Sequence, residues 1–200
     1  MKHQIKRVLF GAVTVSMLSS AVCWAADKPA EAMPEMPQPT KEHAWLQQFV
    51  GDWKAESDLF MEPGKPPVHT TGTEEIEAVG EFWTVSEIES TMMDKPFTGN
   101  MTLGFDTAKK KFVGTWIDSM TGKLWEYEGT VDATGKVLTL NSEGECPMNP
   151  GKLTQFKEVL ELKDENTKTF TSSMLDENGK WVTVMTSTAT RVADDSNADD

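Results

Sequence analysis

The stretch 102-TLGFDTAKKKFVGTWIDSM-120 decides the fold of this chain. Both of its halves are rich in threonine, valine, isoleucine and aromatic residues, which strands favour, and the polar run DTAKKK separates them. Phe105 and Phe112 lie on either side of that run. The stretch therefore predicts two antiparallel strands joined by a short turn, which is a β-hairpin.

The second half of the hairpin also predicts which side chains share a face. Side chains alternate between the two faces of a strand, so Phe112, Gly114, Trp116 and Asp118 point the same way. An aromatic ring and a carboxylate on the face of a glycine-containing strand are suited to lining a pocket for a small molecule.

Strand-like runs continue along the chain, separated by turn sequences such as DATGK and DENGK, and the segment ECPMNPGK is also predicted to be a turn. About ten strands are predicted, over residues 51–60, 68–79, 82–91, 97–105, 111–119, 123–131, 136–143, 154–163, 168–175 and 180–192. Short antiparallel strands in sequence must close on themselves or leave open edges. We therefore predict an all-β fold, a single antiparallel up-and-down β-barrel of about ten strands.

A short amphipathic helix is predicted before the first strand, because Trp45, Leu46, Phe49 and Val50 recur at helical spacing within residues 41–50. The sequence before it is rich in proline and alanine, which is typical of an extended linker. The chain thus divides into a predicted signal peptide (residues 1–25), a linker (26–40), a barrel domain (41–192) and an acidic disordered tail (193–200).

The N-terminus has the three parts of a secretory signal peptide. Basic residues are followed by an apolar run from Val8 to Leu18, and then by small residues before Ala25, where we expect cleavage. The apolar run is too short to span a bilayer as a permanent helix. The sequence therefore predicts a periplasmic or secreted protein with no stable membrane insertion after cleavage.

The chain is strongly acidic, with 19 basic and 32 acidic residues. Cleavage after Ala25 removes three basic residues and no acidic one, which changes the formal net charge from −13 to −16. Nucleic acids and anionic membrane surfaces would repel such a protein, so neither is a predicted partner. Cleavage also leaves Cys146 as the single cysteine, so no disulfide can form within the mature chain.

Two sets of motifs resemble known families. The first is a short helix that leads into Gly51-x-Trp53, combined with Arg191 near the end of the last strand. It resembles the closure signature of the calycin superfamily, which includes lipocalins and fatty-acid-binding proteins. The resemblance implies that Arg191 packs across Trp53 and donates to main-chain carbonyls, which closes one end of the barrel. We therefore assign both residues to structure.

The second set is LGFD, VGTWIDSM and GTVDATGKVLTL, preceded by GEFW and PFTG. These motifs resemble the bacterial family known as domain of unknown function number fifteen-seventy-nine, over roughly His43 to Arg191. The resemblance implies a lipocalin-like barrel. It implies no established activity and offers no catalytic residues to transfer.

The mature sequence offers little for metal binding or nucleophilic catalysis. His43 and His69 are its two histidines, and Cys146 has no histidine near it in the sequence. A catalytic triad, a zinc site and a haem site are therefore disfavoured. The sequence predicts no cofactor and no metal, and it favours a protein that is not an enzyme.

The first functional hypothesis is a barrel that binds a small apolar or amphipathic ligand. A barrel of this strand number is wider than its own side chains fill. Trp116, Trp125 and Tyr127 would stack on the ligand, Asp118 would orient its polar group, and Trp83 is a further candidate for the lining. An ordinary aromatic core is the competing interpretation of these rings.

Two further hypotheses stay open. One is an enzyme of the isomerase or hydratase type that uses carboxylates in the same cavity, with Glu87 and Glu89 on one strand face, or Asp106 and Asp118 across the hairpin, as candidate pairs. The other is a non-catalytic interaction module of the cell envelope, which an apolar outer patch and a filled interior would favour. The sequence leaves the oligomeric state open.

Overall fold

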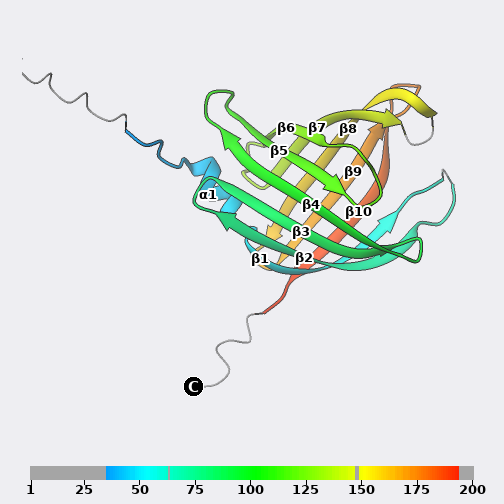
Figure 1. Cartoon of the computed structure of the whole chain (residues 1–200), viewed down its shortest axis with the longest axis horizontal. Helices are drawn as coiled ribbons and strands as arrows, with labels where there is room; N and C mark the ends of the chain where they lie inside the picture. Colours follow the sequence, from blue (N-terminus) through cyan, green and yellow to red (C-terminus); the bar gives the residue numbers. More distant parts are fainter. Residues whose placement is uncertain (1–34, 63, 147–148, 194–200) are drawn as a thin grey trace, which may run out of the picture. The chain divides into compact units, whose positions relative to one another are not determined.

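The computed structural model describes residues 35–62, 64–146 and 149–193. In this part of the chain, ten antiparallel strands close into an up-and-down barrel after one short helix, as predicted (Figure 1). The predicted signal peptide, most of the predicted linker and residues 194–200 of the predicted tail lie outside the described residues. None of the described helices has the length and hydropathy needed to cross a bilayer.

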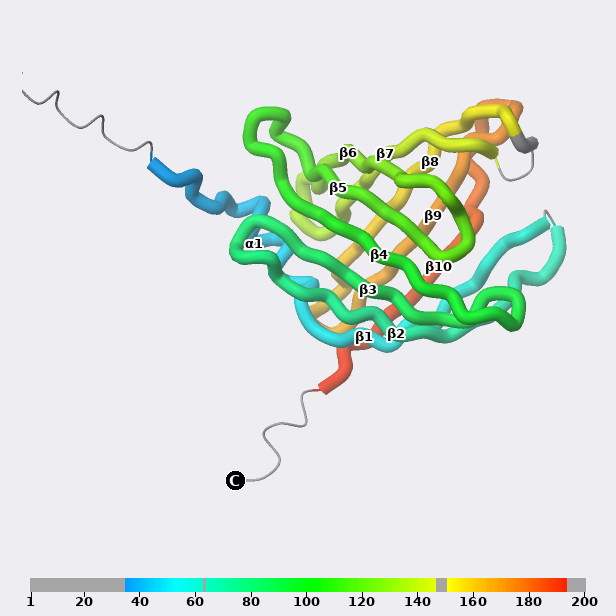
Figure 2. The backbone as a smooth tube through the Cα atoms, viewed as in Figure 1, coloured from blue at the N-terminus to red at the C-terminus, as the bar shows by residue number. Residues whose placement is uncertain are grey.

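Each strand pairs with its neighbour in the sequence, and the first strand also pairs with the last, which closes the barrel. The elements are α1 (Lys41–Gln47), β1 (Gly51–Leu59), β2 (Val68–Val79), β3 (Trp83–Met92), β4 (Lys95–Asp106), β5 (Lys111–Asp118), β6 (Trp125–Val131), β7 (Val137–Cys146), β8 (Asn149–Asp164), β9 (Thr167–Leu175) and β10 (Trp181–Arg191). Figure 2 shows the strands running back and forth between the end near α1 and the opposite end.

The hairpin predicted from residues 102–120 is formed by β4 and β5. Phe105 lies directly opposite Phe112, and their ring centroids are 5.1 Å apart. The predicted turn between them joins the two strands at the end of the barrel near α1 (Figure 1). The alternation of hydrophobic and polar residues therefore set the correct register of this pair.

Strands β7 and β8 are longer than predicted. The segment 145–152 was expected to be a turn, but β7 continues to Cys146 and β8 begins at Asn149, directly opposite it. The pairing shifts its register between Glu145 and Cys146, and strand residues extend into the segment that was predicted to be a turn.

The helix α1 is held against β3 and β4. Leu46 on α1 and Phe49 just after it are buried. His43 is buried too, with its Nδ1 accepting a hydrogen bond from the backbone N–H of Thr40 and its Nε2 lying 3.1 Å from the backbone oxygen of Phe105. Because Nδ1 is the acceptor, Nε2 carries the proton and donates to Phe105. His43 therefore ties the helix to the barrel.

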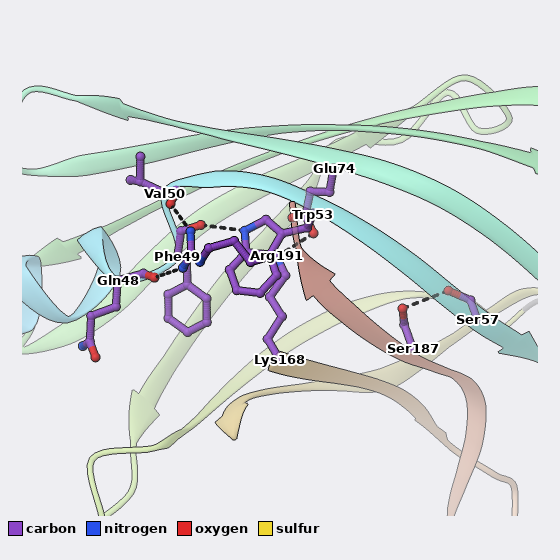
Figure 3. A network of polar contacts seen from close by, with 9 residues as sticks. All are labelled: Gln48, Phe49, Val50, Trp53, Ser57, Glu74, Lys168, Ser187 and Arg191. Atoms are coloured by element: carbon purple, nitrogen blue, oxygen red, sulfur yellow. Dashed lines mark hydrogen bonds and ion pairs between the residues drawn. The ribbon is translucent and has the colours of Figure 1, made fainter. Parts of the chain in front are cut away.

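Trp53 and Arg191 make the contacts that the calycin resemblance implies. Trp53 is fully buried and lies directly opposite Arg191, whose guanidinium carbon is 4.2 Å from the centre of the indole ring (Figure 3). The guanidinium donates to the backbone oxygens of Gln48 at 2.8 Å and of Val50. These bonds fasten the end of β10 to the junction between α1 and β1.

Candidate functional site

A cavity of about 430 Å³ occupies the barrel interior. All ten strands contribute to its lining, Leu46 and Phe49 bound it at the end near α1, and Met120 and Thr121 of the β5–β6 loop bound it at the opposite end. This volume lies within the range of roughly 300–1,000 Å³ that is typical of small-molecule sites. The barrel is therefore wider than its own side chains fill.

The lining is chemically different on its two sides. Strands β4 to β8 carry what we call the aromatic wall, made of Phe97, Trp116, Trp125, Tyr127 and Phe156. The neighbouring group β9, β10, β1, β2 and β3 carries the hydroxyl wall, made of Ser172, Ser187, Ser57, Thr70, Thr84, Ser86 and Ser90. A ligand in the cavity would meet most of the aromatic rings on one side. On the other side it would meet most of the hydroxyl groups, with Phe170 and aliphatic side chains such as Ile88 between them.

Trp116 and Asp118 line the cavity together. The indole Nε1 of Trp116 donates to Oδ2 of Asp118 at 3.0 Å. The other oxygen, Oδ1, accepts the backbone N–H groups of Met120 and Thr121, each at 2.8 Å, and the Thr121 hydroxyl lies 3.1 Å from Oδ2. Asp118 therefore shapes the turn after β5 and fixes the direction of an indole, which leaves its carboxylate little capacity for a ligand.

Trp116 and Trp125 each pack on a glycine of a neighbouring strand. The ring of Trp116 covers Gly99 on β4, and the ring of Trp125 covers Gly144 on β7, so that a Cβ at either position would clash with the indole. Trp125 also packs against Phe156, with ring centroids 5.0 Å apart. The two glycines therefore leave the space that the two indole rings occupy.

Tyr127 is buried within the aromatic wall. Burial raises the pKa of its phenol above the usual range, and the nearby acidic groups of Glu158 and Asp118 raise that pKa further. The phenol is therefore a neutral group that faces two carboxyl side chains.

Trp83 does not line the cavity, so its place in the predicted lining is corrected. Thr84 and Ser86 occupy the inner face of β3, and the alternation of side chains turns Trp83 outward, where 42% of it is exposed. Its ring lies against Gly104 on the adjacent strand β4.

The candidate carboxylate pairs do not come together in the cavity. Glu87 and Glu89 are exposed and, like Trp83, alternate with the inward-facing residues of β3. The β4–β5 register places Asp106 at one end of the hairpin and Asp118 at the other. The register therefore keeps Asp106 and Asp118 apart, and they cannot act as a pair.

Glu158 on β8 is a cavity residue that the sequence analysis missed. It is only 5% exposed, its Oε1 accepts the Ser172 hydroxyl at 3.2 Å, and its Oε2 is buried without a hydrogen-bond partner among the described residues. Burial raises the pKa of Glu158 to about 7, although the hydrogen bond from Ser172 lowers it. Alternation with the inward-facing Phe156 and Leu160 would have identified it.

A buried ion pair lies near the closed end. The Nζ atom of Lys168 is 2.6 Å from Oε2 of Glu74 and 4.6 Å from the centre of the Trp53 ring (Figure 3). Burial lowers the pKa of Lys168, and the charge of Glu74 opposes that effect. This pair was also missed. Within the described ranges, no three side chains of the metal-binding types gather in a way that would hold a metal.

Two solved structures have a similar fold. Rv2717c from M. tuberculosis matches with a TM-score of 0.59 and 14% identity, over 78% of this chain and 100% of its own. The S-type phycobiliprotein lyase CPES from Guillardia theta matches with a TM-score of 0.52 and 15% identity, over 79% of this chain and 99% of its own. At these identities the likeness shows the fold alone. No curated protein sequence matches the chain.

The sequence family named "Protein of unknown function (DUF1579)" matches residues 38–191, a range that includes α1 and all ten strands. It is the family that the motifs LGFD, VGTWIDSM and GTVDATGKVLTL resemble. The match covers most of the chain, and the structural neighbours have the same lipocalin-like architecture. The chain therefore belongs to the DUF1579 family of proteins of unknown function.

Proposed function

We propose that this protein binds a small apolar or amphipathic ligand inside its barrel. The observation that carries the proposal is the cavity of about 430 Å³, whose lining surface is mostly apolar and includes the aromatic wall. Such a lining binds apolar surface and uses its few polar groups to orient the ligand. Trp116, Trp125 and Tyr127 serve as the stacking surfaces.

A carboxylate-based enzyme of the isomerase or hydratase type is the second candidate. The observation in its favour is Glu158, a buried cavity carboxyl whose pKa is about 7, which is the range in which general acid–base catalysis works best. A catalyst converts its ligand, whereas a binding protein returns it unchanged. Mass spectrometry of the ligand that co-purifies, before and after incubation with fresh protein, separates the two.

The binding proposal is tested with the uncharged fluorophore N-phenylnaphthylamine, which brightens in apolar surroundings. We expect saturable binding to the mature protein and at least about a tenfold loss of affinity in Ser86→Phe, because that ring fills the cavity from the inner face of β3. Glu87→Phe is the matched control, since the next side chain points outward. Absence of saturable binding to the wild-type protein, or equal losses in both variants, contradicts the proposal.

We also propose that the protein acts in the periplasm or outside the cell after removal of residues 1–25. The support is the three-part N-terminal sequence. Cell fractionation and N-terminal sequencing test this, and we expect a mature chain that starts at Ala26. A cytoplasmic protein that retains Met1 contradicts it.

A further inference from the structure

We propose that the cavity selects a cationic amphiphile, an amine with an apolar body, and that the carboxyl group of Glu158 receives the ammonium group. This inference rests on the proposed binding function, because it names the chemical class of the ligand. It follows from the charges of the lining, from the hydrogen bonds that these charges already make, and from the groups packed around Glu158.

The charged side chains of the lining are predominantly acidic. Glu74, Asp118 and Glu158 are acids, and Lys168 is the one base among the lining residues that the structure describes. Lys168 is already paired with Glu74 at 2.6 Å. A carboxylate or phosphate ligand would therefore meet an excess of negative charge, with the single ammonium group already occupied, whereas a cation would meet favourable potential.

Glu158 is the acid of the lining that retains capacity for a ligand. Asp118 accepts hydrogen bonds from Trp116 and from the turn that follows it. Glu158 accepts one hydrogen bond, from Ser172, and its Oε2 has no partner among the described residues although it is buried. A buried carboxyl oxygen without a donor is unfavourable, and an ammonium group supplies both the donor and the opposite charge.

The groups around Glu158 suit a cation. Leu140 faces it from β7, Ser172 faces it from β9, and the acidic group of Glu158 acts on the phenol of Tyr127 on β6. None of these three is a base. The faces of aromatic rings attract ammonium groups, so the aromatic wall adds to the effect of the carboxyl. The net charge of −13 on the whole chain would also draw cationic ligands toward the protein.

The test compares three ligands that share one body and differ in their polar group: phenylbutylamine, phenylbutanol and phenylbutyrate. Each displaces N-phenylnaphthylamine from the mature protein at about pH 8, where Glu158 is ionised and the amine is protonated. We expect the amine to act at a concentration at least about tenfold lower than the carboxylate. In Glu158→Gln this ratio should fall to within about threefold, with the potency of the alcohol unchanged.

Glu87→Gln is the matched control, because it removes an acidic group from the outer face of β3, outside the cavity, and the ratio of amine to carboxylate should persist in it. If the wild-type protein shows no preference for the amine, or if the preference survives in Glu158→Gln, the inference is overturned while the binding function stands. If the fluorophore itself does not bind to the wild-type protein, the binding function fails first.

A second readout needs no variant. Between about pH 5 and about pH 8 the amine stays protonated while Glu158 ionises, so displacement by the amine should strengthen, whereas displacement by the alcohol should not. Ser172 does not titrate in this interval, and burial keeps Tyr127 neutral. An amine whose potency is independent of pH overturns the inference even if Glu158→Gln does not fold.

Discussion

The indole Nε1 of Trp116 donates a 3.0 Å hydrogen bond to the carboxylate of Asp118, two residues further along the inner face of β5. The same carboxylate accepts the backbone N–H groups of Met120 and Thr121. One side chain thus sets the direction of an indole in the aromatic wall and the shape of the loop at the end of the cavity. These contacts indicate that Asp118 positions Trp116 and the loop, and does not itself contact a ligand.

Asp118→Asn should therefore lower the free energy of unfolding by about 1–3 kcal/mol. Both carboxylate oxygens of Asp118 accept hydrogen bonds, and the amide NH₂ of asparagine would place a donor where one of these acceptors lies. Urea unfolding measures this. Asp58→Asn is the control, since Asp58 pairs with His69 at the surface, where solvent screens the interaction, and its effect on the free energy of unfolding should be the smaller of the two. Equal effects in the two variants would argue against the role of Asp118 in the turn.

Glu158 should make the stability of the protein depend on pH. Its pKa is raised from 4.5 to about 7 by burial, so the folded state holds the proton more tightly than the unfolded state. Stability from this group is therefore fully present below about pH 4.5 and falls as the pH rises to about 7, by about 3 kcal/mol in total. Urea unfolding of wild type and Glu158→Gln across this interval should show the difference, and a constant offset would contradict it.

Gly99→Ala should disturb the aromatic wall, because the ring of Trp116 covers this glycine and leaves no room for a Cβ. We expect a loss of about 1–3 kcal/mol in the free energy of unfolding, together with weaker binding of N-phenylnaphthylamine. Gly122→Ala is the control, since a Cβ there has no heavy atom within 4 Å. If Gly99→Ala behaves like the control, the indole of Trp116 can move away from a Cβ at position 99 without loss of stability or binding.

Removing only one partner of the Lys168–Glu74 ion pair should lower the free energy of unfolding strongly. Lys168→Met leaves the carboxylate of Glu74 near the closed end without its partner, and we expect a loss of about 3–5 kcal/mol. Replacing both residues, as in Lys168→Met with Glu74→Leu, should recover most of that loss. Chemical unfolding of the two single variants and the double variant gives the coupling energy. Additive losses would mean that the pair contributes nothing as a pair.

The sequence predicted the barrel because the signals that specify it are local. The turn between Phe105 and Phe112 and the alternation within each strand need no knowledge of distant residues. The same alternation places Trp116, Trp125 and Tyr127 on inner faces, as the structure does. Closure by Trp53 and Arg191 was implied by resemblance to a family.

The charged groups of the cavity were harder to predict because their burial and pairing depend on contacts across the barrel. Lys168 meets Glu74 from a strand 94 residues away in the sequence, and neither neighbourhood alone indicates a buried ion pair. Glu158 sits among apolar residues whose alternation was informative, but a lone glutamate on a strand is more often exposed. Trp83 was predicted to face the cavity because large aromatic side chains are usually buried. Its ring instead faces outward and covers Gly104 on the neighbouring strand.

The difference between the aromatic wall and the hydroxyl wall makes the cavity lining asymmetric. A flat ligand turned over about the barrel axis would exchange stacking on Trp116 and Trp125 for contact with serine and threonine hydroxyls. With a third fixed point at Glu158, the two mirror images of a chiral ligand cannot satisfy all three positions equally. If the proposed binding function holds, we expect the barrel to bind one mirror image of a chiral ligand more tightly than the other.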